Sequence, residues 1–285
     1  MRQNQALGEH ASSSYAQLNW QEFEIFQAHN VMPQELVVES LPKHLIVIHT
    51  TLQLVEVIER ADSLRYKGLA QAGSININSA GSMSACQWSE AISFIRLDVP
   101  PKLIEQVAQA DTDSRSCCEL INTAHTHDAK ILQISQWLLD ERNNGGAGGQ
   151  LYVDSLLNLL TVHLLRTYTT QFREARSPNR LTQQQVTRAI DYMHSHLDQD
   201  ISLEVLAQIV NISPSHLRRL FKQATGMAPH QYLINLRVHR AKELLLTRGF
   251  SVNEVAAEVG FADQSHLHRH FKRLFGMTPK TILSS

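Results

Sequence analysis

Residues 215–222 read Ser-His-Leu-Arg-Arg-Leu-Phe-Lys, and residues 265–272 read Ser-His-Leu-His-Arg-His-Phe-Lys. Six of the eight positions are identical. The motif Gly-Met-x-Pro also occurs twice, at residues 226–229 and 276–279. A stacked repeat protein needs at least about three such units to bury a core. Two copies therefore predict a pair of related modules joined by a helix.

Each copy has the pattern of two short helices around a turn. Ser202 and Ser251 are candidate N-caps of the first helices, and Ser251 with Glu254 forms a capping box. Ser213 and Asp263 are candidate N-caps of the second helices. Apolar residues follow the first caps at the i, i+3, i+4, i+7 spacing of one buried helix face. They are Leu203, Leu206, Ala207, Val210 and, in the second copy, Val252, Val255, Ala256, Val259.

The second helix of each copy has one apolar face and one basic, hydrogen-bonding face. Such a helix suits the major groove, where Arg can bind guanine through two bonds and Lys neutralises phosphate. An ordinary solvated charged face is the alternative, but the same Arg and Lys positions recur in both copies. The expected DNA-binding residues are Ser215, Arg218, Arg219, Lys222, Gln264, Ser265, His266, His268, Arg269 and Lys272.

A longer ordered set of residues runs through the same region. It comprises Leu206-Ala207, Ser213-Pro214-Ser215-x-Leu217-x-Arg219-x-Phe221-Lys222, Gly226-x-x-Pro229-x-x-Tyr232, Arg237-x-x-x-Ala241, Ala256-x-x-x-Gly260-Phe261-x-Asp263-Gln264-Ser265-x-x-x-Arg269-x-Phe271-Lys272 and Gly276-x-Thr278-Pro279. This set resembles the AraC/XylS family of transcription regulators over residues 181–285. Leu267 departs from the aromatic residue usual on the buried side, and residues 281–283 depart from the Tyr-Arg frequent near the end.

The resemblance implies an all-α unit of seven helices with two helix-turn-helix modules, at about residues 202–223 and 251–273. A central helix at about residues 229–247 would hold the modules apart. The recognition helices would enter two successive major-groove segments. The base-facing residues carried over are Ser215, Arg218, Arg219, Ser265, His266 and Arg269. RNA polymerase is the further partner that the resemblance implies.

The charge distribution fits DNA binding in one half of the chain. A length of 285 residues suggests two domains. Residues 181–285 hold 12 Lys and Arg against 8 Asp and Glu, a net +4, whereas the first 180 residues hold 14 against 19, a net −5. Eight of the 15 His lie in the basic part, so its charge should rise as the pH falls through about 6.5.

The first half combines strand patterns with later helix patterns, so we expect an α+β protein of two domains. Residues 1–30 are expected to be flexible. Residues 44–49, 52–58, 73–81 and 91–97 contain short β-branched runs, which predict a small antiparallel barrel or jelly roll. This order resembles the cupin-like sensing domain found in the same family. The resemblance implies a domain over residues 31–170, with a small-molecule pocket inside the barrel and dimerisation through its helices.

Three helices are predicted after the strands, at residues 101–110, 129–142 and 151–168, with Trp137 among the inward residues of the second. The third is apolar over more than half of its circumference. It is either packed between the barrel and a neighbouring helix or forms a homodimer contact. Residues 171–180 are the expected linker.

Catalytic and metal chemistry are not expected, and no cofactor is assigned. His125-Thr126-His127 lies after the predicted strands with no Glu just beyond it, and an irregular polar loop explains it. Cys117 and Cys118 could sense metal or redox state, but adjacent cysteines rarely both bind one ion well. Residues 116–119 lack the surroundings of a methyl-accepting cysteine, and no nucleophile elbow or phosphate loop occurs.

The prediction is a sequence-specific, DNA-binding transcription regulator that a small-molecule effector controls. Three Cys and the lack of a long apolar run predict a soluble cytoplasmic protein with no membrane segment. One alternative is an enzyme or metal sensor that uses the DNA-binding module as an address. Another is a constitutive regulator whose barrel is filled by its own side chains, such as Ile75, Ile77, Trp88 and Phe94.

Overall fold

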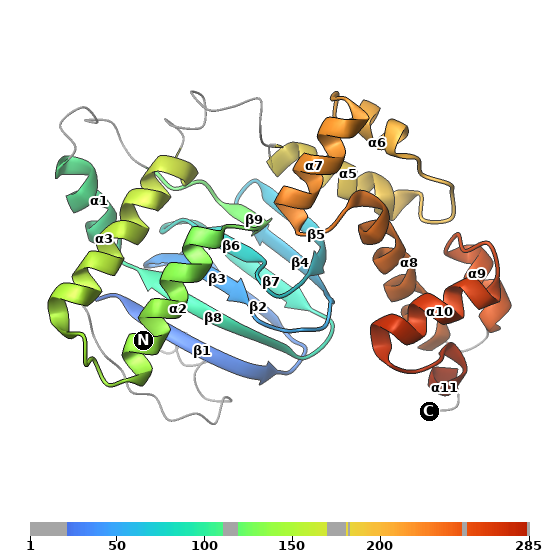
Figure 1. Ribbon diagram of the computed structural model, residues 1–285, viewed down its shortest axis with the longest axis horizontal. Coiled ribbons are helices and arrows are strands. Elements are labelled where there is room, and N and C mark those ends of the chain that lie inside the picture. Colours follow the sequence, from blue (N-terminus) through green and yellow to red (C-terminus); the bar gives the residue numbers. More distant parts are fainter. Residues whose placement is uncertain (1–21, 111–118, 170–180, 182, 247–249, 284–285) are drawn as a thin grey trace. The chain divides into compact units, whose positions relative to one another are not determined.

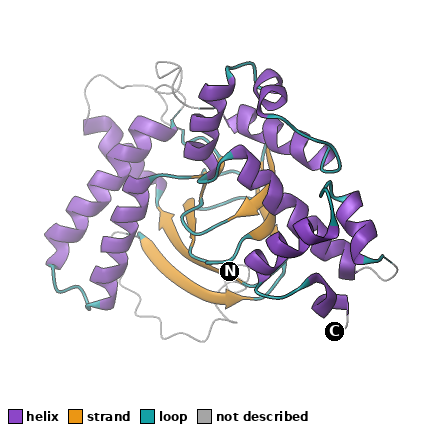
Figure 2. Cartoon of the chain, turned by 45° about the vertical axis from the view of Figure 1, so that its right-hand side comes forward, coloured by secondary structure: helices purple, strands orange, loops and turns teal. Residues whose placement is uncertain are grey.

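The structure, a computed structural model, describes residues 22–110, 119–169, 181, 183–246 and 250–283 (Figure 1). The chain divides into two compact units, and the second begins at Asn179 and also takes in Lys67–Leu69. Strands occur in the N-terminal unit, whereas the described part of the C-terminal unit after that division is helical (Figure 2). The predicted linker at residues 171–180 lies outside the described residues.

The strands of the N-terminal unit form two separate sheets. The first has the order β1-β8-β3-β6-β9 and the second the order β2-β7-β4-β5, and no ladder between described residues joins them into a closed barrel. The strands are β1 (Glu24–Val31), β2 (Glu35–Val38), β3 (His44–His49), β4 (Val55–Ala61), β5 (Leu64–Ala70), β6 (Ile75–Asn78), β7 (Ser84–Trp88), β8 (Ile92–Val99) and β9 (Thr123–Thr126).

Side-chain alternation along β3 separates the two faces of the five-stranded sheet. Ile46 and Ile48 are buried in one cluster with the isoleucines of β6 and with the helices of this unit, whereas Leu45 and Val47 face the other side. Ile46 pairs with Ile77 and Leu97, and Ile48 pairs with Ile75 and Ile95, so the same face continues across β6 and β8. Ile75 and Ile77, which the constitutive alternative would place inside the barrel, face the helices instead.

Three helices cover that face: α1 (Pro101–Ala110), α2 (Ala129–Asn143) and α3 (Gly149–Tyr168). Figure 1 shows α2 and α3 side by side across the sheet. Helix α2 buries Ile131, Ile134 and Leu138, which share one face. Trp137 lies off that face and is 41% exposed, so its predicted inward position is wrong.

The predicted strand positions hold for β3, β6 and β8, with shifts at their ends. The run at residues 52–58 forms β4 only from Val55, because Leu52 lies in the preceding loop and is 94% exposed. Residues 24–30 belong to the stretch expected to be flexible, but with Val31 they form β1, which pairs with β8 and buries Ile25 and Ala28.

The carboxylate of Asp128 links α2 to α3. Its Oδ1 caps α2 by accepting hydrogen bonds from the backbone N–H groups of Lys130 at 2.9 Å and Ile131 at 3.2 Å. Its Oδ2 lies 2.8 Å from His163 Nε2 and accepts a 2.9 Å bond from the Tyr168 hydroxyl. Burial alone raises the pKa of Asp128, but these bonds, His163 foremost, outweigh it and hold the pKa at about 2.

The C-terminal unit contains seven described helices. They are α5 (Gln183–Ser195), α6 (Leu203–Ile209), α7 (Pro214–Thr225), α8 (Pro229–Leu246), α9 (Val252–Glu258), α10 (Gln264–Phe275) and α11 (Pro279–Leu283). The predicted N-caps are confirmed at Ser202, Ser213, Ser251 and Asp263, and both bonds of the capping box with Glu254 are present.

Helix α8 packs against both helix pairs, as predicted for the central helix. The Tyr232 ring meets Phe221 of α7 edge-on, with 5.5 Å between the ring centres. Further along α8, Val238 and Leu245 share a buried cluster with α9 and α10. Residue 247, at which the helix was predicted to end, lies outside the described residues.

Gly260, in the turn between α9 and α10, fits closely against the loop that follows α5. Its φ of +78° lies in the left-handed region that favours glycine. A Cβ atom there would lie 2.3 Å from the Leu197 carbonyl oxygen and 2.9 Å from an Arg237 guanidinium nitrogen. The Arg237 Nε donates to the same carbonyl at 2.9 Å, so neither neighbour can move freely.

We expect Asp128→Asn to lower the free energy of unfolding by about 1–3 kcal/mol at pH 6. Because the folded-state pKa of Asp128 lies below the unfolded value, its contribution is present above about pH 4 and disappears as the pH falls through about 2. Urea unfolding of both proteins at pH 6 and at pH 3 should show the difference shrinking in acid. Asp140→Asn on the exposed face of α2 is the control; a difference for Asp128→Asn that is constant with pH contradicts the interpretation.

We expect Gly260→Ala to destabilise the C-terminal unit by more than about 2 kcal/mol, because the substitution combines a left-handed backbone with a contact against rigid backbone. Gly276→Ala is the matched control, since Gly276 has a φ of +72° and nothing within 4 Å of a built Cβ. Thermal unfolding measures both. Equal losses of stability for the two variants would show that the Leu197 contact has no cost.

Candidate functional site

The second helix of the first module, α7, divides as predicted into a buried and an exposed face. Leu217, Leu220 and Phe221 are buried. The four residues predicted to bind DNA on this helix are all exposed, and they follow Ser213, the N-cap, within three turns. They are Ser215, Arg218, Arg219 and Lys222.

The corresponding helix, α10, presents Ser265, Arg269 and Lys272 to solvent. Gln264, His266 and His268 are half-buried instead. The two helices therefore keep equivalent exposed Ser, Arg and Lys positions, in agreement with the repeat in the sequence.

His266 has partners inside the module. Its ring meets Phe261 edge-on, with 5.2 Å between ring centres, and its Nε2 lies 3.1 Å from His270 Nε2. His270 in turn lies 3.0 Å from Arg273. The predicted base-facing role of His266 stays a prediction. The histidine pair could not be predicted from the sequence, because it depends on the turn that positions Phe261.

Two histidines of the C-terminal unit titrate well below the usual range. Burial, followed by the charge of Arg273, lowers the pKa of His270 to about 4. Burial is also the main reason that the pKa of His194 is lowered to about 4. Both stay neutral at pH 6 and do not contribute to the expected rise in positive charge.

A cavity of about 90 Å³ lies between the two sheets of the N-terminal unit. Its walls are largely apolar and include Leu45, Val47, Trp88 and Phe94. Trp88 and Phe94, which the constitutive alternative would use to fill the interior, line this cavity without filling it. The polar groups at the wall are His49, Glu59, Asn76, Asn78, Ser84, Arg60 and Arg96.

Arg96 is held in place at the cavity wall. Its Nε and a terminal nitrogen donate to the two oxygens of Asp98 at 2.6 and 2.7 Å. Its guanidinium also lies over the Phe26 ring, 5.4 Å from the centre. The charge of Arg96 is therefore paired with Asp98 within the unit.

His125 does not lie in the irregular loop that the sequence predicted. It belongs to β9, the outer strand of the five-stranded sheet, and lies close to His49 and Glu59. This arrangement corrects the expectation that the His-x-His motif has no carboxylate partner. Cys117 and Cys118 lie outside the described residues. Within the described residues, none of the helices combines the length and apolar character needed to cross a bilayer.

Comparison with known proteins concerns mainly the C-terminal part. Residues 206–285 match the family model described as a helix-turn-helix domain. The lactose operon transcription activator of Staphylococcus xylosus is 30% identical over 83 residues, which are 29% of this chain and 30% of that protein. An uncharacterized HTH-type transcriptional regulator of Haemophilus influenzae is 30% identical over 135 residues, which are 47% of this chain and 45% of that protein.

Among solved structures, the DNA-binding domain of AdpA, a global transcriptional factor in complex with a target DNA, is 34% identical. The match covers 35% of this chain and 89% of that chain, with a TM-score of 0.34. The chain spans less than half the length of the two curated relatives above. The family model and the sequence relatives agree with the paired helices, their caps and their repeated basic faces. Residues 206–285 therefore form a helix-turn-helix domain of the AraC/XylS type.

Proposed function

We propose that this protein is a sequence-specific DNA-binding transcription regulator. The single observation that carries the proposal is the repeated exposed face of α7 and α10. Ser215, Arg219 and Lys222 on α7 correspond to Ser265, Arg269 and Lys272 on α10, and all six are exposed. A structural role inside the unit would not require the same polar residues at the same exposed positions twice.

The chemistry of this face suits the major groove. The groove is about 12 Å wide and admits one helix, whose polar side chains can reach base edges and phosphates. In this proposal Arg219 and Arg269 bind guanine through two hydrogen bonds, whereas Lys222 and Lys272 contact phosphate as point charges. Arg218 on α7 is replaced by His268 on α10, so the two modules would prefer different bases.

The proposal extends to control by a small molecule in the N-terminal unit, which we regard as cupin-like. The cavity between the sheets supports it, because its apolar walls with a few polar groups are typical of ligand sites. A volume of about 90 Å³ restricts the effector to a small molecule. Contact with RNA polymerase is part of the same proposal and rests on the resemblance to the family.

We also propose that the protein forms a homodimer through α3. The helix buries Leu156, Leu160 and Leu164 against the sheet, which accounts for one side of its apolar surface. On another side, three apolar residues remain exposed: Leu159 by 50%, Val162 three residues later by 38%, and Leu151 about two turns before Leu159 by 81%. An apolar strip of this kind on a soluble domain is typical of an interaction surface.

Arg218→Ala and Arg269→Ala should each weaken binding to the specific target sequence, the operator, by about 1–3 kcal/mol. Each should also relax the sequence preference, because each removes a base contact. Lys222→Ala should weaken binding to all DNA sequences alike. It should also lower, by about one, the slope of the logarithm of the binding constant against the logarithm of salt concentration. Fluorescence anisotropy with DNA from around the gene, titrated over salt with random competitor, measures these effects. Arg240→Ala is the control, since Arg240 is exposed on α8 outside both faces. Equal losses on operator and random DNA for Arg269→Ala would remove its role in base reading.

Leu159→Lys should shift the protein from dimer to monomer in analytical ultracentrifugation, because a charge would enter the apolar strip. The control is Leu52→Lys in the loop before β4, where the side chain is 94% exposed. A wild-type protein that sediments as a monomer at micromolar concentration would contradict the proposed interface.

A further inference from the structure

A bulge at the outer edge of the five-stranded sheet brings His125 into the interior. Ile75 pairs with Thr126 and Ile77 pairs with Thr123, so β9 has one residue more than β6 between the same two pairings. His125 lies in this bulge with a φ of +47°, which is uncommon for a residue with a side chain. Bulges and unusual backbone angles of this kind are frequent next to functional sites, where they redirect a side chain.

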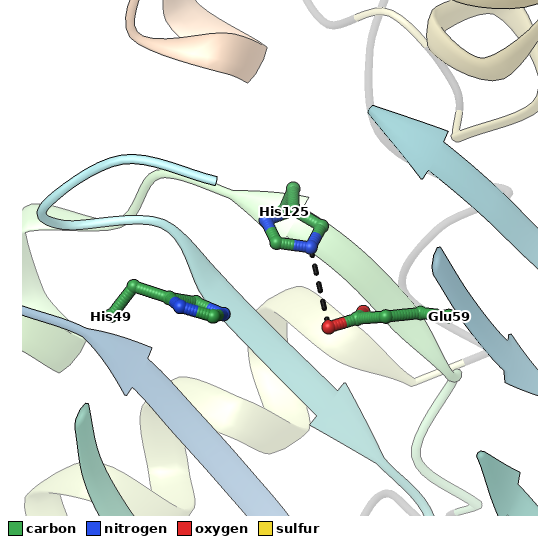
Figure 3. A group of neighbouring side chains, drawn as sticks. All are labelled: His49, Glu59 and His125. Atoms are coloured by element: carbon green, nitrogen blue, oxygen red, sulfur yellow. Dashed lines mark ion pairs between the residues drawn. The ribbon is translucent and has the colours of Figure 1, made fainter. Parts of the chain in front are cut away.

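Three side chains from three strands converge at this point. His49 comes from the end of β3, Glu59 from the middle of β4 and His125 from β9. All three are buried, and one nitrogen or oxygen atom of each lies within 4.8 Å of those of the other two. Figure 3 shows the two rings and the carboxylate pointing toward one common space. Two ligands of a zinc ion at about 2.1 Å lie at most about 4.2 Å apart. Side-chain shifts of less than an ångström would therefore complete a coordination site.

A plain buried ion pair explains only part of this cluster. His125 Nε2 lies 3.3 Å from Glu59 Oε1, which accounts for one nitrogen and one oxygen. Neither ring nitrogen of His49, nor Nδ1 of His125, has a hydrogen-bond partner among the described residues. Leaving a buried polar atom without a partner is unfavourable. A bound cation would provide a partner for a ring nitrogen of His49, which no described neighbour does.

Neighbouring residues fix the three side chains in place. The Asn76 amide donates to Glu59 and accepts a 2.8 Å bond from the His125 backbone N–H, so one side chain orients both. The Cys86 thiol donates to the Glu59 carboxylate at 3.6 Å. The Tyr66 ring stacks on His125 with 4.4 Å between ring centres. Outer contacts of this type are what orients metal-binding histidines and carboxylates.

We propose that His49, Glu59 and His125 bind one divalent first-row transition-metal ion. Two neutral imidazoles and one carboxylate form a ligand set that suits zinc and iron(II). A neutral imidazole offers one nitrogen lone pair for coordination, and both ring nitrogens of His49 are buried without a described hydrogen-bond partner. His49 and Glu59 also line the cavity between the sheets, so a remaining coordination position of the ion faces that space. A water molecule or a small oxygen or nitrogen donor would bind there.

The site is independent of the DNA-binding face, because no residue of the C-terminal unit contributes to it. The full-length protein is purified, stripped with chelator and titrated with Co²⁺, a spectroscopic substitute for Zn²⁺. We expect one ion per chain, with visible absorption bands of low-coordinate cobalt and without thiolate charge-transfer absorption. Zn²⁺ should displace Co²⁺ and raise Tm, because it binds the folded chain only.

Glu59→Gln, His49→Gln and His125→Gln should each weaken Co²⁺ binding by more than about 100-fold. His29→Asn, which removes an exposed histidine of the same unit, should leave the affinity within about threefold of wild type. Circular dichroism establishes which variants fold. Because Glu59→Gln changes the shape of the residue least, it keeps the comparison valid if a histidine variant does not fold.

Zinc X-ray absorption on the wild-type protein tests the ligand set without any substitution. We expect imidazole and oxygen ligands and no sulfur. Sulfur ligands would overturn the proposal, since they would place the ion at cysteines elsewhere in the chain. Failure of the stripped wild-type protein to bind Co²⁺, or binding that a folded Glu59→Gln variant retains, would overturn it as well. DNA binding is measured separately, so loss of this proposal leaves the regulator proposal standing.

Discussion

The two-sided character of β3 is the constraint on which the N-terminal unit depends. Ile46 and Ile48 pack against the helices on one face of the sheet. The alternate residues of the strand, Leu45, Val47 and His49, line the cavity on the opposite face. A shift of register by one residue would exchange these sets and place His49 among the helices. Antiparallel pairing with β6 and β8 fixes the register, so the cavity and the histidine cluster both follow from the same alternation.

Much of the C-terminal unit could be predicted from the sequence because its signals are local. Capping residues such as Ser213, Ser251 and Asp263 act within a single turn, and each caps the helix that was predicted. The helix-turn-helix assignment to the AraC/XylS type is confirmed by the family match and the sequence relatives. The domain boundaries and the individual DNA-contacting residues stay predictions. The half-buried position of His266 could not be foreseen, since it depends on the packing of Phe261 across the turn.

The N-terminal unit was predicted less completely because its strands depend on pairing rather than on composition. The β-branched run of β3 gave a clear signal, but β9 contains only Thr-Ala-His-Thr and exists through its pairing with β6. The cluster of His49, Glu59 and His125 joins strands that are far apart in the sequence. The sequence around His125 therefore shows no carboxylate partner, because that carboxylate belongs to Glu59 of β4.

The exchange of Arg218 for His268 at equivalent positions of the two modules has a consequence for the geometry of a target site. Both helices have an N-cap, a buried Leu and Phe at equivalent positions and a Lys near the end, so both would dock in the same manner. One long cation and one imidazole at the same position would nevertheless favour different bases. A target for this chain would then have two unlike halves, and its sequence would give the bound protein a direction along the duplex. Polarity relative to a promoter could thus arise within a single chain, without help from a second subunit.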